Sequence, residues 1–167
     1  MSDDVEIVGI RDVQDTDLEL FYEQQLDPEA VRRARFPSRE REAFMTHWAT
    51  KVLGDSTGFV QTITVAGEPA GNIVAWWADE PDQQEPRRFI GYWFGRPYWG
   101  RGIGTQALTL FLGLERTRPL YADPFAGNTA SVRLLEKHGF QHTGTVRYGE
   151  DEHAMLVLHE GPSGERR

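Results

Sequence analysis

The sequence contains no cysteine among its 167 residues. This absence excludes thiol catalysis, thiolate metal sites and a disulfide framework. Long hydrophobic runs are also missing, because no apolar run approaches the roughly 20 residues that a membrane-spanning helix needs. The first residues, MSDDVEIV, are acidic where a secretory signal would be basic. We therefore predict a cytoplasmic protein that folds without disulfides and has no membrane segment.

Net positive charge is lacking too, because 26 acidic residues outnumber 18 lysines and arginines and give a formal net charge of −8. A surface of this sign repels phosphate backbones and anionic lipids, so we expect no nonspecific binding to nucleic acids or membranes. The charge is compatible with a cationic substrate but does not by itself indicate one. The five histidines form no His-Glu-x-x-His pattern, and we expect no metal site.

The length fits a single domain over residues 1–160, and we expect the tail GPSGERR at 161–167 to be disordered. Hydrophobic residues alternate between strand and helix periods along the chain. Strands are predicted at 5–10, 59–65, 71–77, 88–94, 119–123, 140–146 and 154–159. Helices are predicted at 15–25, 38–53, 103–114 and 128–138, with Asp15 or Thr16 capping the first and Ser38 capping the second. A short helical or irregular piece is predicted at 27–35.

The stretch YWGRGIGT, from Tyr98 to Thr105, lies between a predicted strand and a predicted helix. The first N–H groups of a helix are unpaired and bind anions, and glycines let a phosphate approach the backbone. Arg101 adds a positive charge beside this turn. The spacing matches neither the Walker A motif nor the dinucleotide fingerprint. Taken alone, the turn is compatible with a phosphate site or with a tight turn that only packs the helix on the sheet.

A second motif, NTASVRLLEKHGF, follows about 25 residues later and runs from Asn128 to Phe140. The pair WGRGIG and N-x-x-S-x-x-x-L-E-K-x-G-F, in this order and separation, resembles the GNAT superfamily of acetyltransferases. The preceding GYWFGRPYW is similar to the branch of the RimJ/RimL ribosomal-protein N-terminal acetyltransferases. The resemblance implies an α/β (α+β) fold with a mixed, twisted sheet of about seven strands, helices on both faces and splayed central strands.

The resemblance also implies a cofactor, acetyl-coenzyme A, and residues that hold it. Trp99 stands where the superfamily usually has Arg or Gln, and tryptophan there is familiar in the RimJ/RimL-like branch. The backbone N–H groups of the glycine turn would bind the pyrophosphate, Asn128 would contact the pantetheine arm, and Ser131 would lie near the thioester sulfur. The implied cofactor contacts are Trp99, Gly100, Arg101, Gly102, Ile103, Gly104, Thr105, Asn128 and Ser131.

The chemistry of the resembling enzymes asks for a proton donor, an oxyanion donor and a base. Many of these enzymes protonate the departing thiolate with a tyrosine seven residues after the asparagine, but this chain has Leu135 there. Ser131 is then the candidate donor. The oxyanion would be stabilised by a backbone N–H near Trp93 or Phe94. The candidate bases are Asp79, Glu80, Asp123, Glu150, Asp151 and Glu152, for each of which a solvated surface position is the favoured interpretation.

Two interpretations of function remain open at this point. The first is an N-acetyltransferase that acetylates a primary amine of a peptide N-terminus or a small molecule, as a monomer or homodimer. The second is a non-catalytic acyl-coenzyme A binding module that acts as a sensor or scaffold. A local basic cluster lies between Arg32 and Arg41, and the favoured interpretation is a solvated helical face. The alternative is that the cluster contacts the 3′-phosphate of coenzyme A or an acidic partner.

Overall fold

A computed structural model of the protein describes residues 7–79 and 84–160, so the predicted tail at 161–167 lies outside the described residues. The described strands are β1 Val8–Arg11, β2 Phe59–Val65, β3 Glu68–Ala78, β4 Arg87–Phe94, β5 Leu120–Ala122, β6 Gln141–Tyr148 and β7 Asp151–Leu158. The helices are α1 Asp17–Gln24, α2 Pro28–Ala34, α3 Arg41–His47, α4 Ile103–Leu114 and α5 Thr129–Lys137. A π-helical turn, Trp48–Val52, continues α3, and a 3-10 turn, Arg96–Tyr98, follows β4.

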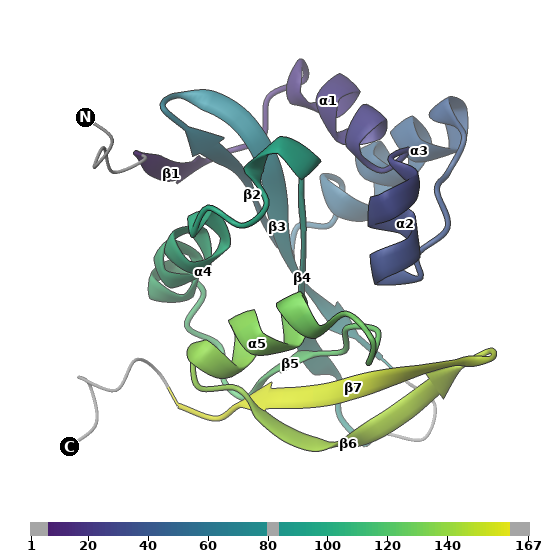
Figure 1. Cartoon of the computed structure of the whole chain (residues 1–167), viewed down its shortest axis with the longest axis vertical. Coiled ribbons are helices and arrows are strands. Elements are labelled where there is room, and N and C mark those ends of the chain that lie inside the picture. Colours follow the sequence, from purple (N-terminus) through teal and green to yellow (C-terminus); the bar gives the residue numbers. More distant parts are fainter. Residues whose placement is uncertain (1–6, 80–83, 161–167) are drawn as a thin grey trace.

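All seven strands belong to one mixed sheet in the order β1-β2-β3-β4-β5-β7-β6. Neighbouring strands are antiparallel except for β4 and β5, which run parallel at the centre of the sheet. Figure 1 shows the sheet twisting strongly between the β1–β3 end and the β6–β7 hairpin. The predicted mixed sheet of seven strands is therefore confirmed.

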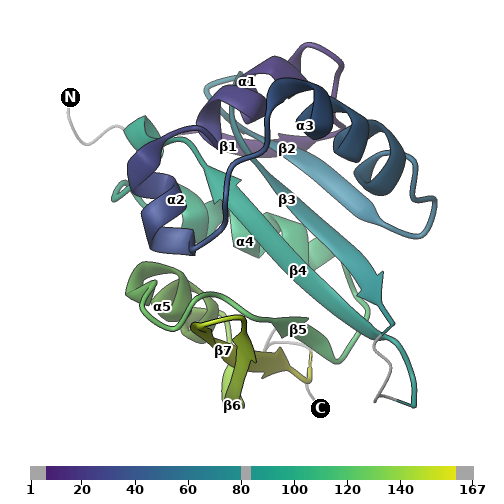
Figure 2. The same ribbon diagram turned by 90° about the vertical axis from the view of Figure 1, so that its right-hand side faces the viewer.

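Helices cover both faces of the sheet, and each face has its own apolar cluster. On one face, Ile103, Phe111 and Leu135 of α4 and α5 pack against Ile63 and Ile73 of the central strands, within a larger cluster of buried residues. On the other face, residues of α1, α3 and the π-helical turn pack against the opposite sides of β2 and β3; these are Phe21, Phe44 and Trp48, with Val60 and Val74. Figure 2 shows α1, α2 and α3 on one side of the sheet, with α4 behind it.

The first residues of two helices differ from the sequence prediction. The first helix begins at Asp17, and neither Asp15 nor Thr16 caps it through a side chain. Instead, the Asp17 carboxylate accepts the Gln14 N–H at 2.9 Å and the Thr62 hydroxyl at 2.8 Å. Ser38 lies outside α3, whose N-cap residue is Glu40. Thr16 thus occupies the predicted N-cap position without a side-chain hydrogen bond, whereas the Ser38 prediction was wrong because the extended residue Glu40 precedes the helix.

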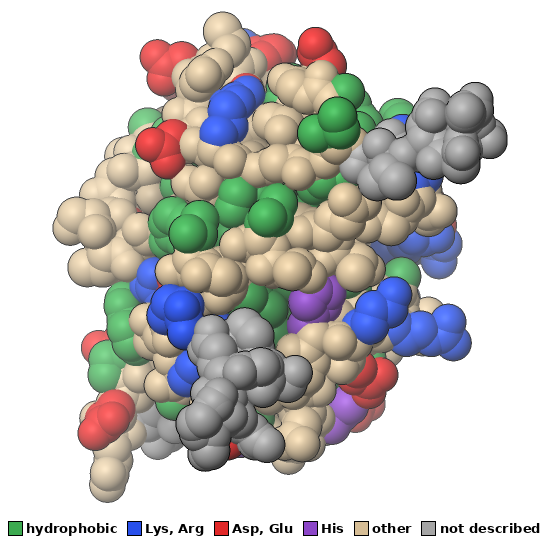
Figure 3. All heavy atoms as spheres, turned by 90° about the vertical axis from the view of Figure 1, so that its left-hand side faces the viewer, with side chains coloured by type: hydrophobic (Ala, Val, Ile, Leu, Met, Phe, Trp, Pro, Cys, Tyr) green, Lys and Arg blue, Asp and Glu red, His purple; other side chains and the backbone are tan. Residues whose placement is uncertain are grey.

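The outer surface of α4 carries exposed apolar residues without forming a continuous patch. Leu110 and Leu114 are among the exposed large hydrophobic residues. Figure 3, which looks onto the side of the molecule that carries α4, shows hydrophobic side chains in several groups separated by backbone and by other side chains. Among the residues that the structure describes, no helix is sufficiently long and apolar to cross a bilayer.

Candidate active site

The parallel strands β4 and β5 pair at only two positions, Arg88 with Leu120 and Phe89 with Tyr121. Beyond them β4 continues to Phe94, whereas β5 ends at Ala122, so the two strands separate and the predicted splay is confirmed. A cleft of about 470 Å³ lies along this open edge of β4. Its lining comes from the end of β4, the glycine turn, α5 and one side of α2.

The register of β3 and β4 decides which backbone groups of β4 face the cleft. The Gly95 N–H donates to the Ala70 carbonyl at 3.0 Å, which makes Gly95 a hydrogen-bonded partner of β3. Because hydrogen-bonding direction alternates along a strand, the N–H and C=O groups of Trp93 also point to β3. The Trp93 carbonyl indeed lies 2.2 Å from where a Cβ on Gly71 would be.

The backbone groups of Tyr92 and Phe94 therefore point away from β3, toward the open edge. The Phe94 carbonyl accepts a hydrogen bond from the Trp99 indole at 2.9 Å on that side, in agreement with this alternation. Trp93 and Phe94 were the two residues expected to donate a backbone N–H to the oxyanion. The register keeps Phe94 as a candidate, because its N–H faces the cleft, and it turns the Trp93 N–H toward β3. Tyr92 joins Phe94 as a second residue with an N–H facing the cleft, and the catalytic role of either group stays a prediction.

The glycine turn brings the N-terminus of α4 to the mouth of the cleft. Gly100 and Gly102 adopt the left-handed region with φ of 70° and 77°, which favours glycine at both positions. Gly102 is the N-cap residue of α4, and no side chain caps this end. The first N–H groups of the helix, including those of Ile103, Gly104 and Thr105, therefore have no intrahelical acceptor. Such a row of donors suits a phosphate group.

At Gly104 a glycine is needed for close packing, not for an unusual backbone conformation. A Cβ at this position would lie 3.2 Å from Leu134 Cδ2 and 3.5 Å from the Phe94 ring. The glycine therefore lets α4 approach α5 and the end of β4. The packing interpretation therefore holds for Gly104, whereas the left-handed Gly100 and Gly102 leave the phosphate interpretation as a prediction.

The positive charge at the cleft comes from Arg33, a member of the basic cluster noted in the sequence, and from two residues that the sequence analysis did not select. Arg33, Arg133 and Lys137 line it, and the Lys137 ammonium lies 3.5 Å from the Thr105 hydroxyl on the turn. Arg101 is not part of the lining; its guanidinium donates to the Pro97 carbonyl at 2.8 Å and lies over the Tyr98 ring. The spacing of Arg133 and Lys137, four residues apart on one helix face, was the available signal.

The basic cluster between Arg32 and Arg41 divides between surface and cleft. Arg33 stacks over the Trp99 ring, with its guanidinium carbon 4.2 Å from the ring centroid, and so links α2 to the glycine turn. The other members include arginines paired with carboxylates away from the cleft: Arg32 with Glu29, Arg41 with Glu19 and Arg35 with Asp151. These contacts agree with the solvated-face interpretation. Arg33 also pairs with Glu29, with Nε 3.6 Å from Oε2, but unlike the others it lines the cleft.

The first turn of α5 presents the predicted polar pair to the same cleft. Asn128 is the N-cap residue, and its side-chain oxygen accepts the Ser131 N–H at 3.4 Å. The Ser131 hydroxyl oxygen lies 2.7 Å from the Tyr92 hydroxyl on the facing strand. Burial raises the pKa of the Tyr92 phenol above its ordinary value and outweighs the opposite effect of the Ser131 hydrogen bond. Tyr92, which the sequence analysis did not assign to the site, is thus a neutral phenol beside Ser131.

The proposed bases lie apart from this arrangement. The Asp123 carboxylate accepts a hydrogen bond from the Tyr148 hydroxyl at 2.6 Å, and Asp151 pairs with Arg35 at 3.3 Å. Glu80 lies outside the described residues. Of the described residues that line the cleft, none is an aspartate, glutamate or histidine. Nowhere within 7–79 and 84–160 do three such side chains gather closely enough to hold a metal ion.

Comparison with known proteins identifies the family. The model of the family described as "Acetyltransferase (GNAT) domain" matches residues 8–141, well over half of the chain. The chain belongs to the GNAT acetyltransferase family. A curated relative, aminoglycoside N(6′)-acetyltransferase type 1 from Klebsiella pneumoniae, is 26% identical over 120 residues, which cover 70% of this chain and 57% of that protein. The match thus spans little more than half the length of this relative.

Solved structures share the fold of this GNAT domain. Aminoglycoside acetyltransferase AAC(6′)-Ib in complex with coenzyme A superposes with a TM-score of 0.74 at 22% identity, covering 92% of this chain and 95% of that chain. RimL, a ribosomal L7/L12 alpha-N-protein acetyltransferase in complex with coenzyme A, also gives 0.74, at 17% identity, covering 92% and 94%. The predicted superfamily is confirmed. The two enzymes give equal TM-scores, so the comparison does not assign the chain to the RimJ/RimL branch.

Proposed function

We propose that this GNAT domain is an N-acetyltransferase that uses acetyl-coenzyme A to acetylate a primary amine. The observation that carries the proposal is the cleft on the open edge of β4, with an uncapped helix N-terminus at its mouth. The residues present fit the cosubstrate: unpaired N–H groups and three cationic side chains suit its phosphates, and an extended strand edge suits its amide-bearing arm. When bound, acetyl-coenzyme A supplies an activated acetyl thioester.

Each group of the cleft has a proposed task in this reaction. The N–H groups from Gly102 to Thr105 bind the pyrophosphate, with Lys137 and Arg133 adding charge. The backbone of Phe94 and the side chain of Asn128 hold the pantetheine arm. The Tyr92 N–H donates to the acetyl oxygen, where negative charge develops. As the bond between the amine nitrogen and the acetyl carbon forms and the C–S bond breaks, Ser131 donates its hydroxyl proton to the departing sulfur. The amine nitrogen releases one proton to water, and a proton from water restores the Ser131 hydroxyl.

Binding of the cosubstrate is tested with Gly102→Val and a matched control, Gly149→Val. Both glycines have positive φ, 77° and 65°, and open space around the missing Cβ, so valine strains the backbone similarly at each. Only Gly102 lies at the cleft. Calorimetry should show that Gly102→Val loses at least about tenfold in coenzyme A affinity, the size of one lost charged hydrogen bond. Equal affinities for the two folded variants would contradict the proposed phosphate site.

Turnover is tested by the release of free thiol from acetyl-coenzyme A. The chain has no cysteine, so a thiol-reactive dye reports coenzyme A alone. The acceptor panel follows the similar structures: RimL is named for the N-terminus of ribosomal L7/L12, AAC(6′)-Ib has been crystallised with kanamycin, and a Vibrio cholerae spermidine N-acetyltransferase with spermine. Rapid release with an N-terminal peptide would place the chain in the RimJ/RimL branch. Release with kanamycin or spermine would favour a small-molecule acceptor.

The second candidate, a non-catalytic acyl-coenzyme A binding module, is favoured by one observation. No carboxylate or histidine lines the described cleft, so deprotonation of the acceptor has no side-chain base there. Tight binding of acetyl-coenzyme A without thiol release for any amine would support this module. Release for one acceptor would exclude it and would indicate that water carries the proton away.

A further inference from the structure

Tyr92 and Ser131 meet across the cleft, although 39 residues separate them in the chain. Tyr92 comes from β4 and Ser131 from the first turn of α5, and both line the cleft. Their hydroxyl oxygens are 2.7 Å apart, an ordinary distance for an O–H···O hydrogen bond. Leu135, the position at which many GNAT enzymes carry a tyrosine, is buried in the apolar core and brings no hydroxyl to this site.

Two hydroxyl groups hold two protons, and their mutual hydrogen bond uses only one of them. If Ser131 donates, the spare proton belongs to Tyr92, whose next acceptor is the Ser131 carbonyl at 3.4 Å. If Tyr92 donates, the spare proton belongs to Ser131. Among the described residues, Ser131 Oγ has no hydrogen-bond partner other than Tyr92. Its proton is then available to a group in the cleft.

We propose that Tyr92 is a positioning residue whose phenol donates to Ser131 Oγ and thereby directs the Ser131 proton at the sulfur of bound coenzyme A. This inference rests on the proposed function. The phenol stays protonated at neutral pH, because its ordinary pKa of 10.0 lies well above neutrality and burial raises it further. Tyr92 therefore acts as a fixed donor, and it supplies no proton to the products. Its backbone N–H, which faces the cleft independently, is unaffected by a change of the side chain.

Tyr92→Phe isolates the phenolic oxygen. The ring packs against Phe94, with centroids 5.6 Å apart, and phenylalanine keeps this contact. Without the phenol, Ser131 loses the donor that fixes its hydroxyl and can turn its own proton to a backbone carbonyl. A matched control is Tyr121→Phe, which removes a phenol from β5, where the ring contacts Phe89 and Arg87 and does not line the cleft.

The first experiment needs no acceptor. Because the chain lacks cysteine, the sulfur of bound coenzyme A is the only thiol of the complex, and its thiolate absorbance can be titrated as a difference spectrum. A hydrogen bond to the thiolate lowers the pKa of the thiol. We expect this pKa to rise in Tyr92→Phe by about half a unit to one unit, a threefold to tenfold loss of thiolate, and to stay unchanged in Tyr121→Phe. An unchanged pKa in Tyr92→Phe would overturn the inference.

The second experiment is a double-mutant cycle in turnover. We expect Tyr92→Phe to lower kcat by about three- to tenfold with little change in KM for acetyl-coenzyme A, and Ser131→Ala to lower it somewhat more. The double variant should be no slower than Ser131→Ala, because Tyr92 acts through Ser131. If the loss of kcat in the double variant equals the product of the two single losses, Tyr92 has a role separate from Ser131 and the positioning role is refuted.

The two proposals fail in different ways. If the wild-type protein does not bind coenzyme A, the proposed function is wrong. If it binds coenzyme A and the thiol titrates identically in wild type and Tyr92→Phe, the function stands and the positioning role is wrong.

Discussion

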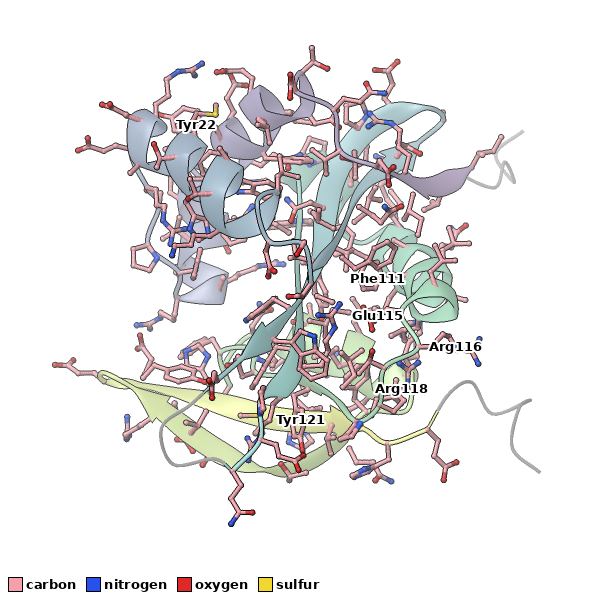
Figure 4. The ribbon with its side chains drawn as sticks, turned by 180° about the vertical axis from the view of Figure 1, so that it is seen from behind. Tyr22, Phe111, Glu115, Arg116, Arg118 and Tyr121 are labelled. Carbon is pink, nitrogen blue, oxygen red and sulfur yellow. The ribbon has the colours of Figure 1, made fainter. Side chains whose placement is uncertain are left out.

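The buried ion pair between Arg88 and Glu115 lies where β4 and β5 are still paired, before the two strands separate. Removing its charge tests how much this pair stabilises the fold. Arg88 lies on β4 at one of the two positions paired with β5, and Glu115 follows the last residue of α4. Their side chains are 6% and 5% exposed, and Nη2 donates to Oε1 at 2.9 Å. Figure 4 shows Glu115 near Phe111, where α4 ends against the sheet. Glu115→Gln keeps the shape of the side chain and removes its charge.

The expected loss of stability follows from the burial of Arg88. Removing one partner of a buried pair leaves an uncompensated charge and costs about 3–5 kcal/mol. The glutamine can still accept a hydrogen bond, and Arg88 still donates to the Thr57 carbonyl at 2.8 Å, so we expect the lower end, about 3 kcal/mol. For a chain of this length, each kcal/mol shifts Tm by about 2–4 °C, which predicts a fall of about 6–12 °C.

Thermal unfolding followed by circular dichroism measures this change. The matched control is Glu19→Gln, which removes the same charge from an exposed pair with Arg41. Exposed ion pairs contribute little to stability, so the control should leave Tm nearly unchanged. A fall in Tm for Glu115→Gln that is no larger than that of the control would refute the reasoning.

Two further predictions concern pH and cosubstrate binding. Burial acts to raise the pKa values of Asp17 and Glu115, but the hydrogen bonds and charges of Arg11 and Arg88, together with other donors, outweigh it and lower both. The stability that these two groups contribute is present above their ordinary pKa values of 3.8 and 4.5, and it is lost as the pH falls through their lower pKa values in the folded protein. Tm should therefore drop in acid, and it should drop less steeply in Glu115→Gln. Lys137→Met should raise KM for acetyl-coenzyme A about tenfold, with a weaker effect in high salt and little change in kcat. Lys51→Met, in the π-helical turn and outside the cleft lining, should leave KM unchanged. A KM for Lys137→Met within twofold of wild type would show that the lysine does not meet the phosphates.

The sequence by itself determined most helices and strands and the backbone conformation of the glycine turn. Helix and strand periods depend on neighbouring residues, so α4 was predicted at its observed bounds and the strand before it to within a residue. Positive φ at Gly100 and Gly102 is likewise a local property that glycine permits. The N-cap position of Asn128 and the end of α5 before Gly139 follow from the same short-range chemistry.

Only the tertiary structure decided which groups face the cleft. The choice between Trp93 and Phe94 depends on the register with β3, because backbone direction alternates along β4 and a shift of one residue would reverse it. Arg101 is next to the turn in sequence yet turns to Pro97, whereas Lys137 reaches the turn from α5. The Tyr92–Ser131 pair joins residues 39 positions apart, and the Arg88–Glu115 pair joins residues 27 apart. Such contacts exist only after sheet and helices have packed, because nothing in the local chain directs one side chain toward the other.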